Sequence, residues 1–215
     1  MSKLLAYYTP DLQQWHDPTA LGARRWRLTD RGLEVQEGGI LRTDGEPQTV
    51  RRIIGQYRAD LEFAARTCAV PIEILVATVC TESGGNPKAL RIEPRYISDE
   101  KTPGRISYGL TQTLLSSAGE AMGFPVDRTW LEKPLNALLA GGKCIYRKRG
   151  VTKYDPPLVA GAYNAGSLRP STRNPWGLVC TDDGDNDPTD GGDHVTKWVK
   201  WFNDAWAVLS EGAAV

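Results

Sequence analysis

The carboxylic acid Glu82 lies at the end of the most apolar stretch of the chain. The stretch reads PIEILVATVCTE from Pro71 to Glu82, and Ser83-Gly84-Gly85 follows it, which predicts a buried helix with a glycine stop. Desolvation and the negative end of the helix dipole would both disfavour the anion there, so we expect a raised pKa. A carboxyl group that stays protonated near neutral pH can donate a proton to a glycosidic oxygen. The alternative is a last-turn glutamate that points into water.

Three short strings contain side chains suited to work with such an acid. They are TESGGNP at 81–87, SYGLTQ at 107–112 and AYNAG at 162–166, and the helix-forming string NALLAGGKCIY at 136–146 separates the last two. The neutral groups of Gln112, Tyr163 and Asn164 match the acetamido and hydroxyl groups of an N-acetylhexosamine polymer. Taken without Glu82, the same three residues are ordinary cap and turn residues, and Gly166 is a helix stop.

In this order, the strings resemble the soluble lytic transglycosylases of glycoside hydrolase family 23, which share a lysozyme-like fold with goose-type lysozymes. The resemblance covers about residues 50–205 and implies that Glu82 is the catalytic acid and base. It also implies that Tyr163 orients the catalytic carboxyl group. Thr111 departs from the methionine usual in the family, a change that we expect to affect packing or the lining of the cleft more than chemistry. The substrate-binding residues that the resemblance implies are Ser83, Gln112, Tyr163 and Asn164, and Tyr108 and Tyr146 are further candidates.

The implied reaction is cleavage of the bond between N-acetylmuramic acid and N-acetylglucosamine in peptidoglycan, with a 1,6-anhydro product. This route needs one carboxyl group because the substrate supplies the nucleophile. Hydrolysis by the usual routes needs two carboxyl groups. The segment from Ile92 to Glu100 lengthens the connection after Glu82 relative to the simplest family members, and its Glu93 and Asp99 are the candidates for a second carboxylate. The alternative is a solvated loop in which Arg91, Arg95 and Arg105 pair with these acids.

The remaining pattern predicts a mainly α fold, a lysozyme-like helical domain with a small N-terminal β-hairpin extension. Apolar residues recur at helical spacing from 50 to 68, and further helices are expected near 112–122, 134–147, 156–165 and 193–209. A hairpin is expected at 25–36, turning at Asp30-Arg31-Gly32. We therefore predict an extension at 1–48 and a transglycosylase domain at 49–215.

Composition limits the partners. The 215 residues include 26 lysines and arginines against 26 aspartates and glutamates, so no overall charge attracts nucleic acid. Two histidines and four dispersed cysteines predict reduced thiols, no metal site and no cofactor. In the acidic stretch 182–190, the residues from Asp183 onward begin like a calcium loop. Counted from Asp183, however, the sixth position is Pro188 rather than glycine and the twelfth is His194 rather than glutamate, so a solvated loop is expected. Seven tryptophans exceed the needs of a small core and suggest a glycan or partner surface.

The absence of an apolar targeting segment in the sequence indicates where the protein is made. It has no run of about 18 apolar residues and no signal-peptide pattern at its start, so we expect synthesis in the cytoplasm and no stable membrane insertion. Action in the periplasm or cell wall would then require delivery by a holin, a phage tail or a secretion system. The sequence does not choose between a phage lysin, a virion-associated enzyme and an exported effector. Chitin is an alternative substrate, and a non-catalytic glycan-binding component is an alternative function. The sequence also does not define the oligomeric state or the role of residues 1–48.

Overall fold

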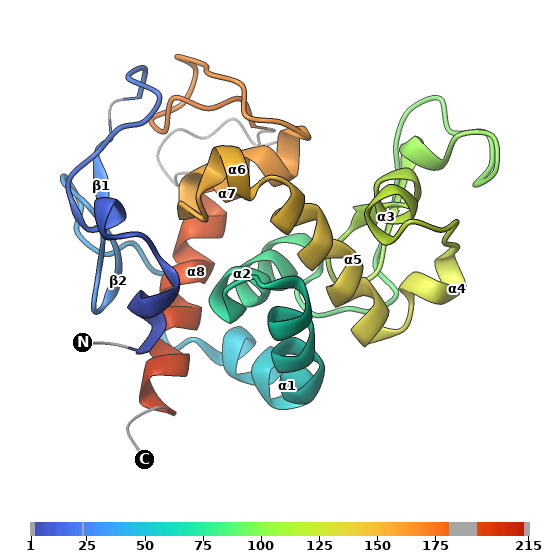
Figure 1. Ribbon diagram of the computed structural model, residues 1–215, viewed down its shortest axis with the longest axis horizontal. Helices are drawn as coiled ribbons and strands as arrows, with labels where there is room; N and C mark the ends of the chain where they lie inside the picture. The colour runs from blue at the N-terminus through green and yellow to red at the C-terminus, as the bar shows by residue number, and fades with distance from the viewer. Residues whose placement is uncertain (1–2, 23, 181–192, 213–215) are drawn as a thin grey trace. The chain divides into compact units, whose positions relative to one another are not determined.

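The computed structural model describes residues 3–22, 24–180 and 193–212. Within these residues eight α-helices and five short strands form, which confirms the predicted mainly α class with an N-terminal hairpin. The chain divides into two compact units, drawn in Figure 1. Unit 1 comprises Met1–Arg51 with Lys148–Val215, and unit 2 comprises Arg52–Arg147. The predicted division into 1–48 and 49–215 stays a prediction.

Unit 1 joins the beginning and the end of the chain. Its elements are the 3₁₀ helices η1 (Lys3–Tyr7) and η2 (Pro10–Gln13), the strands β1 (Trp26–Thr29) and β2 (Gly32–Val35), and the helices α6 (Arg149–Thr152), α7 (Pro156–Ala165) and α8 (His194–Glu211). The strands form the predicted antiparallel hairpin, with Trp26 opposite Val35. Helix α8 packs against α7 and β2. Its Asn203 accepts from Leu33 N at 2.7 Å and donates to Leu33 O at 3.0 Å, so α8 fixes the hairpin.

The core of unit 1 is rich in tryptophan. Four tryptophan side chains of this unit are fully buried, and two of them lie on α8 at helical spacing. The four are Trp26, Trp176, Trp198 and Trp206, of which the last two belong to α8. The expectation that surplus tryptophans form a glycan or partner surface is therefore wrong for Trp26 and Trp176, whereas Trp198 and Trp206 lie in the core, as their spacing along the predicted helix at 193–209 indicates.

Unit 2 contains most of the helical region that the sequence pattern identified. Its elements are α1 (Gln48–Cys68, from Arg52 onward), α2 (Ile72–Ser83), α3 (Leu115–Met122), α4 (Arg128–Leu131), α5 (Pro134–Arg147), the 3₁₀ helix η3 (Pro103–Arg105) and a sheet of β3 (Leu90–Ile92), β4 (Ile106–Tyr108) and β5 (Thr113–Leu114). The sheet is antiparallel with β4 in the centre. Every residue of α2 from Glu73 to Cys80 is buried, which confirms the predicted core helix.

Several details differ from the sequence-based expectation. The helix expected near 112–122 begins at Leu115, because Gln112 has a left-handed backbone (φ 44°) and Thr113 pairs with Tyr108 in the sheet. The short helix α6 was not predicted. The acidic stretch 182–190 lies outside the described residues. Within the described part of the chain, no single helix is long and apolar enough to span a membrane, and only α1 and α2 together, bent by 120° at their junction, meet that test.

Candidate active site

Glu82 lies half-buried in the last turn of α2, immediately before the end of the helix. Gly84 terminates α2 in the left-handed conformation (φ 58°, ψ 20°). The backbone beyond Glu82 is held by α1, because Arg52 donates to Gly84 O at 2.6 Å and the Tyr57 hydroxyl donates to Gly85 O at 3.1 Å. Sequence reasoning missed these two supporting residues, which carry no local signal. The raised pKa expected for Glu82 stays a prediction.

Ser83 connects the end of α2 to the turn after β4. Its hydroxyl donates to Leu110 O at 2.7 Å and accepts from Gly85 N at 3.1 Å. The 81–87 and 107–112 strings, which are distant in the sequence, are therefore brought together in unit 2. The predicted contact of Ser83 with a sugar would have to be made by a hydroxyl group that already has these two partners.

Gln112 closes the same turn with its side-chain amide. The amide nitrogen donates to Ala89 O at 2.8 Å and to Gly109 O at 3.1 Å, and the amide oxygen accepts from the Ser107 hydroxyl at 3.2 Å. Gly109 is required here, because its φ is +79° and a Cβ would lie 2.5 Å from Leu131 O. The geometry gives Gln112 a structural role beside the sugar contact that was predicted for it.

The other predicted residues of unit 2 lie around this turn and on α5. Tyr108, in β4, is half-buried and packs against a cluster of buried apolar residues, and Tyr146 is half-buried in the last turn of α5. Thr111 is fully buried and donates to Ala137 O at 2.9 Å. A Cβ on Gly141 would lie 2.7 Å from Thr111, so Thr111 packs closely against α5 at Gly141. Packing is one of the two roles expected for Thr111.

Tyr163 and Asn164 belong to unit 1. They occupy the last turn of α7 and are half-buried, and Gly166 follows them in the left-handed conformation (φ 79°, ψ −24°). The predicted helix stop at Gly166 is confirmed. Glu82 and its neighbours thus come from one compact unit, and Tyr163 and Asn164 come from the other.

Both candidates for a second carboxylate are held in ion pairs within unit 2. Glu93 pairs with Arg91 at 2.9 Å. Asp99 binds Arg128 through both carboxylate oxygens at 2.7 Å and also accepts from the Tyr96 hydroxyl at 2.7 Å. The hydrogen bonds from Arg128 hold the pKa of Asp99 below its usual value. The Arg91 contact is one that the alternative interpretation expected, whereas the partner of Asp99 is Arg128 rather than Arg95 or Arg105. The catalytic role of the two acids stays a prediction.

Unit 2 also contains a hollow of about 680 Å³ between the loop that holds Asp99 and the α3 region. Its lining includes Pro103, Leu115, Phe124 and Val126. Asp99 is the one predicted site residue in this lining. Among the residues that the structure describes, no group of three or more histidine, cysteine or acidic side chains is arranged to hold a metal ion.

Comparison with known proteins identifies the family. The model of the transglycosylase SLT domain matches residues 61–174, which is more than half of the chain. The chain belongs to the transglycosylase SLT domain family. The matched region contains all of the catalytic and substrate-binding residues predicted above, from Glu82 to Asn164, so the resemblance seen in the sequence is confirmed at the level of the family.

A solved structure supports the same fold. The chain is similar to an inactive mutant of the lytic transglycosylase Slt from Pseudomonas aeruginosa, with a TM-score of 0.51 and 16% sequence identity. The similarity covers 74% of this chain but only 24% of that protein, so the chain spans about a quarter of its length. The family and this neighbour together support the predicted lysozyme-like fold. No curated protein sequence matches the chain.

Proposed function

We propose that the chain is a lytic transglycosylase that cleaves the bond between N-acetylmuramic acid and N-acetylglucosamine in peptidoglycan. The observation that carries the proposal is the family match over residues 61–174, together with the place of Glu82 inside it. Glu82 ends a buried helix whose terminus is fixed by Arg52 and Tyr57, and such fixation is what a proton donor needs to meet one oxygen atom.

The proposed reaction uses Glu82 twice. Its carboxyl group first protonates the glycosidic oxygen while the bond from that oxygen to C1 of N-acetylmuramic acid breaks. The C6 hydroxyl of the same sugar then attacks C1, and the Glu82 carboxylate takes the hydroxyl proton. Glu82 ends in its starting state, and the products are a free 4-hydroxyl group and a 1,6-anhydro ring. No water is consumed, so no second carboxylate is required.

The contacts of Glu93 and Asp99 favour this route over hydrolysis. A general base must be available to accept a proton from water. Asp99 is bound by Arg128 and Tyr96 through short hydrogen bonds, and its lowered pKa makes it a weak base. Glu93 is occupied by Arg91. A hydrolase that used either acid would first have to break these contacts.

The direct test compares Glu82→Gln with the wild-type protein on purified peptidoglycan sacculi. We expect the variant to remain folded and to release soluble fragments at least about 100-fold more slowly, because general acid and base catalysis is worth about 100- to 10,000-fold. Glu93→Gln is the matched control, since it makes the same chemical change at a carboxylate of the same unit. Full activity of Glu82→Gln would contradict the proposal, and loss of activity in Glu93→Gln would favour hydrolysis.

We further propose the setting that the sequence favours: delivery by other proteins, a phage or exported role, and action in the periplasm or cell wall. The basis is the sequence pattern described above. Chitin oligomers belong in the same assay. Chitin contains N-acetylglucosamine but lacks the lactyl ether of N-acetylmuramic acid. Cleavage of chitin without cleavage of sacculi would therefore show that chitin, rather than peptidoglycan, is the substrate.

A further inference from the structure

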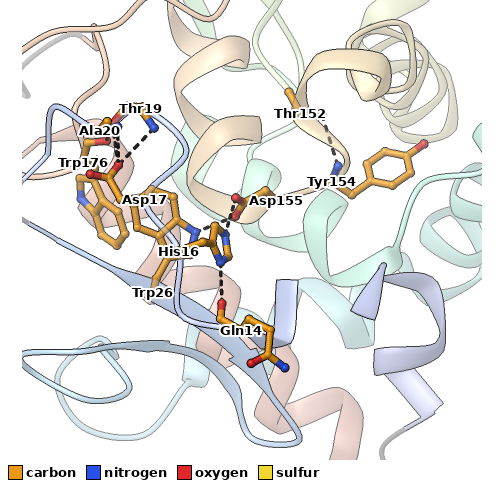
Figure 2. Close-up of polar contacts among 10 residues, drawn as sticks. All are labelled: Gln14, His16, Asp17, Thr19, Ala20, Trp26, Thr152, Tyr154, Asp155 and Trp176. Carbon is orange, nitrogen blue, oxygen red and sulfur yellow. Dashed lines mark hydrogen bonds and ion pairs between the residues drawn. The ribbon is translucent and has the colours of Figure 1, made fainter. Parts of the chain in front are cut away.

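A buried polar cluster in unit 1 joins the N-terminal segment to the start of α7 (Figure 2). Asp155, immediately before α7, is only 1% exposed. One of its carboxylate oxygens accepts from the indole Nε1 of Trp26 at 2.8 Å, and the other lies 2.8 Å from Nε2 of His16. His16 and Trp26 also pair through their backbones at 3.0 Å in both directions. Both oxygens of Asp155 are therefore bonded to residues that lie about 130 positions earlier in the chain.

Asp155 does not have the usual function of its position. It is the N-cap residue of α7, and an aspartate at an N-cap ordinarily accepts from amides of the first helical turn. Its side chain makes no such bond. Pro156 and Pro157 fill the first two helical positions and have no N–H to offer. The carboxylate is directed to the N-terminal segment instead.

The turn before Asp155 has an unusual backbone. Lys153 and Tyr154 are both left-handed, with φ values of 50° and 59°, although neither is glycine. Such a conformation persists only where the surrounding contacts determine it. Asp155 N donates to Thr152 O at 2.8 Å, and the side chain of Asp155 is fixed by Trp26 and His16. The cluster therefore anchors the strained turn that leads into α7.

Helix α7 connects this anchor to two site residues. Tyr163 and Asn164 occupy its last turn, about 12 Å along the axis from Asp155 at 1.5 Å per residue. A tilt of about 10° at the anchored end would move them by about 2 Å over that length. Misplacement of a reacting group by about 1 Å can lower a rate about 100-fold. The anchor is thus mechanically suited to control the placement of both side chains.

We propose that Asp155, held by His16 and Trp26, is a positioning residue that sets the placement of Tyr163 and Asn164 for catalysis. The inference rests on the proposed function, because Tyr163 and Asn164 are site residues only in that context. It assigns the segment around His16 a role in activity, although that segment lies outside the region matched by the family model.

The anchor contains one proton that can titrate. Nδ1 of His16 lies 2.8 Å from Gln14 O, which can only accept, so Nδ1 carries a proton. The bond between Nε2 and Asp155 then needs a second proton, on either the ring or the carboxyl group. The acidic groups that act on His16 are Asp155 from α7 and Asp17 from its own segment, and β1 contributes the uncharged Trp26.

The shifts of both partners favour keeping this proton in the folded state. Burial lowers the pKa of His16, but the hydrogen bond and charge of Asp155, together with the hydrogen bond to Gln14 O and the charge of Asp17, outweigh burial, so the net pKa is raised. Burial raises the pKa of Asp155, and the hydrogen bonds from His16 and Trp26 oppose that rise. The contribution of His16 is complete below its ordinary pKa of about 6.5 and is lost as the pH rises through its raised folded value. We expect the anchor to weaken in that alkaline window.

The experiment measures kcat and KM for fragment release from soluble peptidoglycan strands across pH for three variants. His16→Ala removes the link and should lower kcat about tenfold at pH 6, with KM within about twofold of wild type. Asp155→Asn keeps the shape, since its amide can donate to a neutral His16 and accept from Trp26. This variant should keep the wild-type kcat at pH 6, and it should not show the fall in kcat that we expect for the wild-type protein at alkaline pH. Glu34→Gln is the matched control, because it breaks an ion pair with Arg27 in the same segment and should change neither constant.

A second readout separates this inference from the proposed function. The backbone amide signals of residues 158–165 in ¹⁵N spectra should move in His16→Ala and stay in place in Glu34→Gln. If the wild-type protein releases no fragments, the proposed function fails, and these spectra alone decide whether His16 positions α7. Folded His16→Ala with wild-type kcat at pH 6, a change in KM alone, or unmoved α7 signals would each overturn the inference.

Discussion

Replacement of Gln112 by alanine tests whether this residue mainly holds the site or mainly binds substrate. The change removes three hydrogen bonds, to Ala89 O, Gly109 O and the Ser107 hydroxyl. Both carbonyl groups keep a second partner, because Gly109 N donates to Ala89 O and Gln112 N donates to Gly109 O. For these two bonds the loss is therefore the net value of each, about 0.5–1.5 kcal/mol. The buried Ser107 hydroxyl loses its Gln112 acceptor, which costs about 1–3 kcal/mol unless water replaces it.

We expect Gln112→Ala to lower the free energy of unfolding by about 2 kcal/mol, near the low end of the sum because the half-buried site admits water. For a chain of this size that corresponds to a fall in Tm of about 4–8 °C. Thermal and urea unfolding measure the stability, and fragment release measures the activity. A Tm within about 1 °C of wild type with activity reduced more than about tenfold would refute the structural reasoning and restore sugar binding as the main role.

Three further substitutions test other parts of unit 2. Gly109→Ala should cost about 3 kcal/mol, since it adds left-handed strain and places a Cβ 2.5 Å from Leu131 O. Gly123 has a similar φ of +81°, but a Cβ added there would have no atom within 4 Å. Gly123→Ala should therefore cost only about 1 kcal/mol in the same unfolding assay. Equal losses of stability in the two variants would refute the predicted clash at Gly109. Asp99→Asn removes a carboxylate whose pKa is lowered in the folded protein. Such a carboxylate stabilises the fold above about pH 4, and this stabilisation is lost as the pH falls through the pKa of the folded state. The variant should melt below wild type at pH 7, match it in strong acid and keep its lytic activity, whereas loss of activity would make Asp99 catalytic.

Local patterns predicted most of the helices. Helix α5 runs from Pro134 to Arg147 and α7 from Pro156 to Ala165, both as expected, because a proline marks each start and apolar residues follow at helical spacing. The stop of α2 at Gly84 was equally readable. These features depend on residues within one or two turns of each other, which is why they appear in the sequence.

The contacts that hold the site depend on residues far apart in the chain. Ser83 bonds Leu110, and His16 bonds Asp155 across 139 positions, and neither pair leaves a periodic trace. The same limit explains the late start of α3, since the left-handed backbone of Gln112 is supported by the distant carbonyl group of Ala89. The order of the three strings nevertheless identified the family, because each string preserves a local combination of residues.

The chemistry at Glu82 is the central claim, and the masses of the products test it most directly. Soluble fragments from sacculi treated with the wild-type protein should carry 1,6-anhydro ends, each lighter by one water than the corresponding reducing end, and Glu82→Gln should release them at least about 100-fold more slowly. Reducing ends from the wild-type protein, or anhydro products released by Glu82→Gln at the wild-type rate, would contradict the single-carboxylate mechanism.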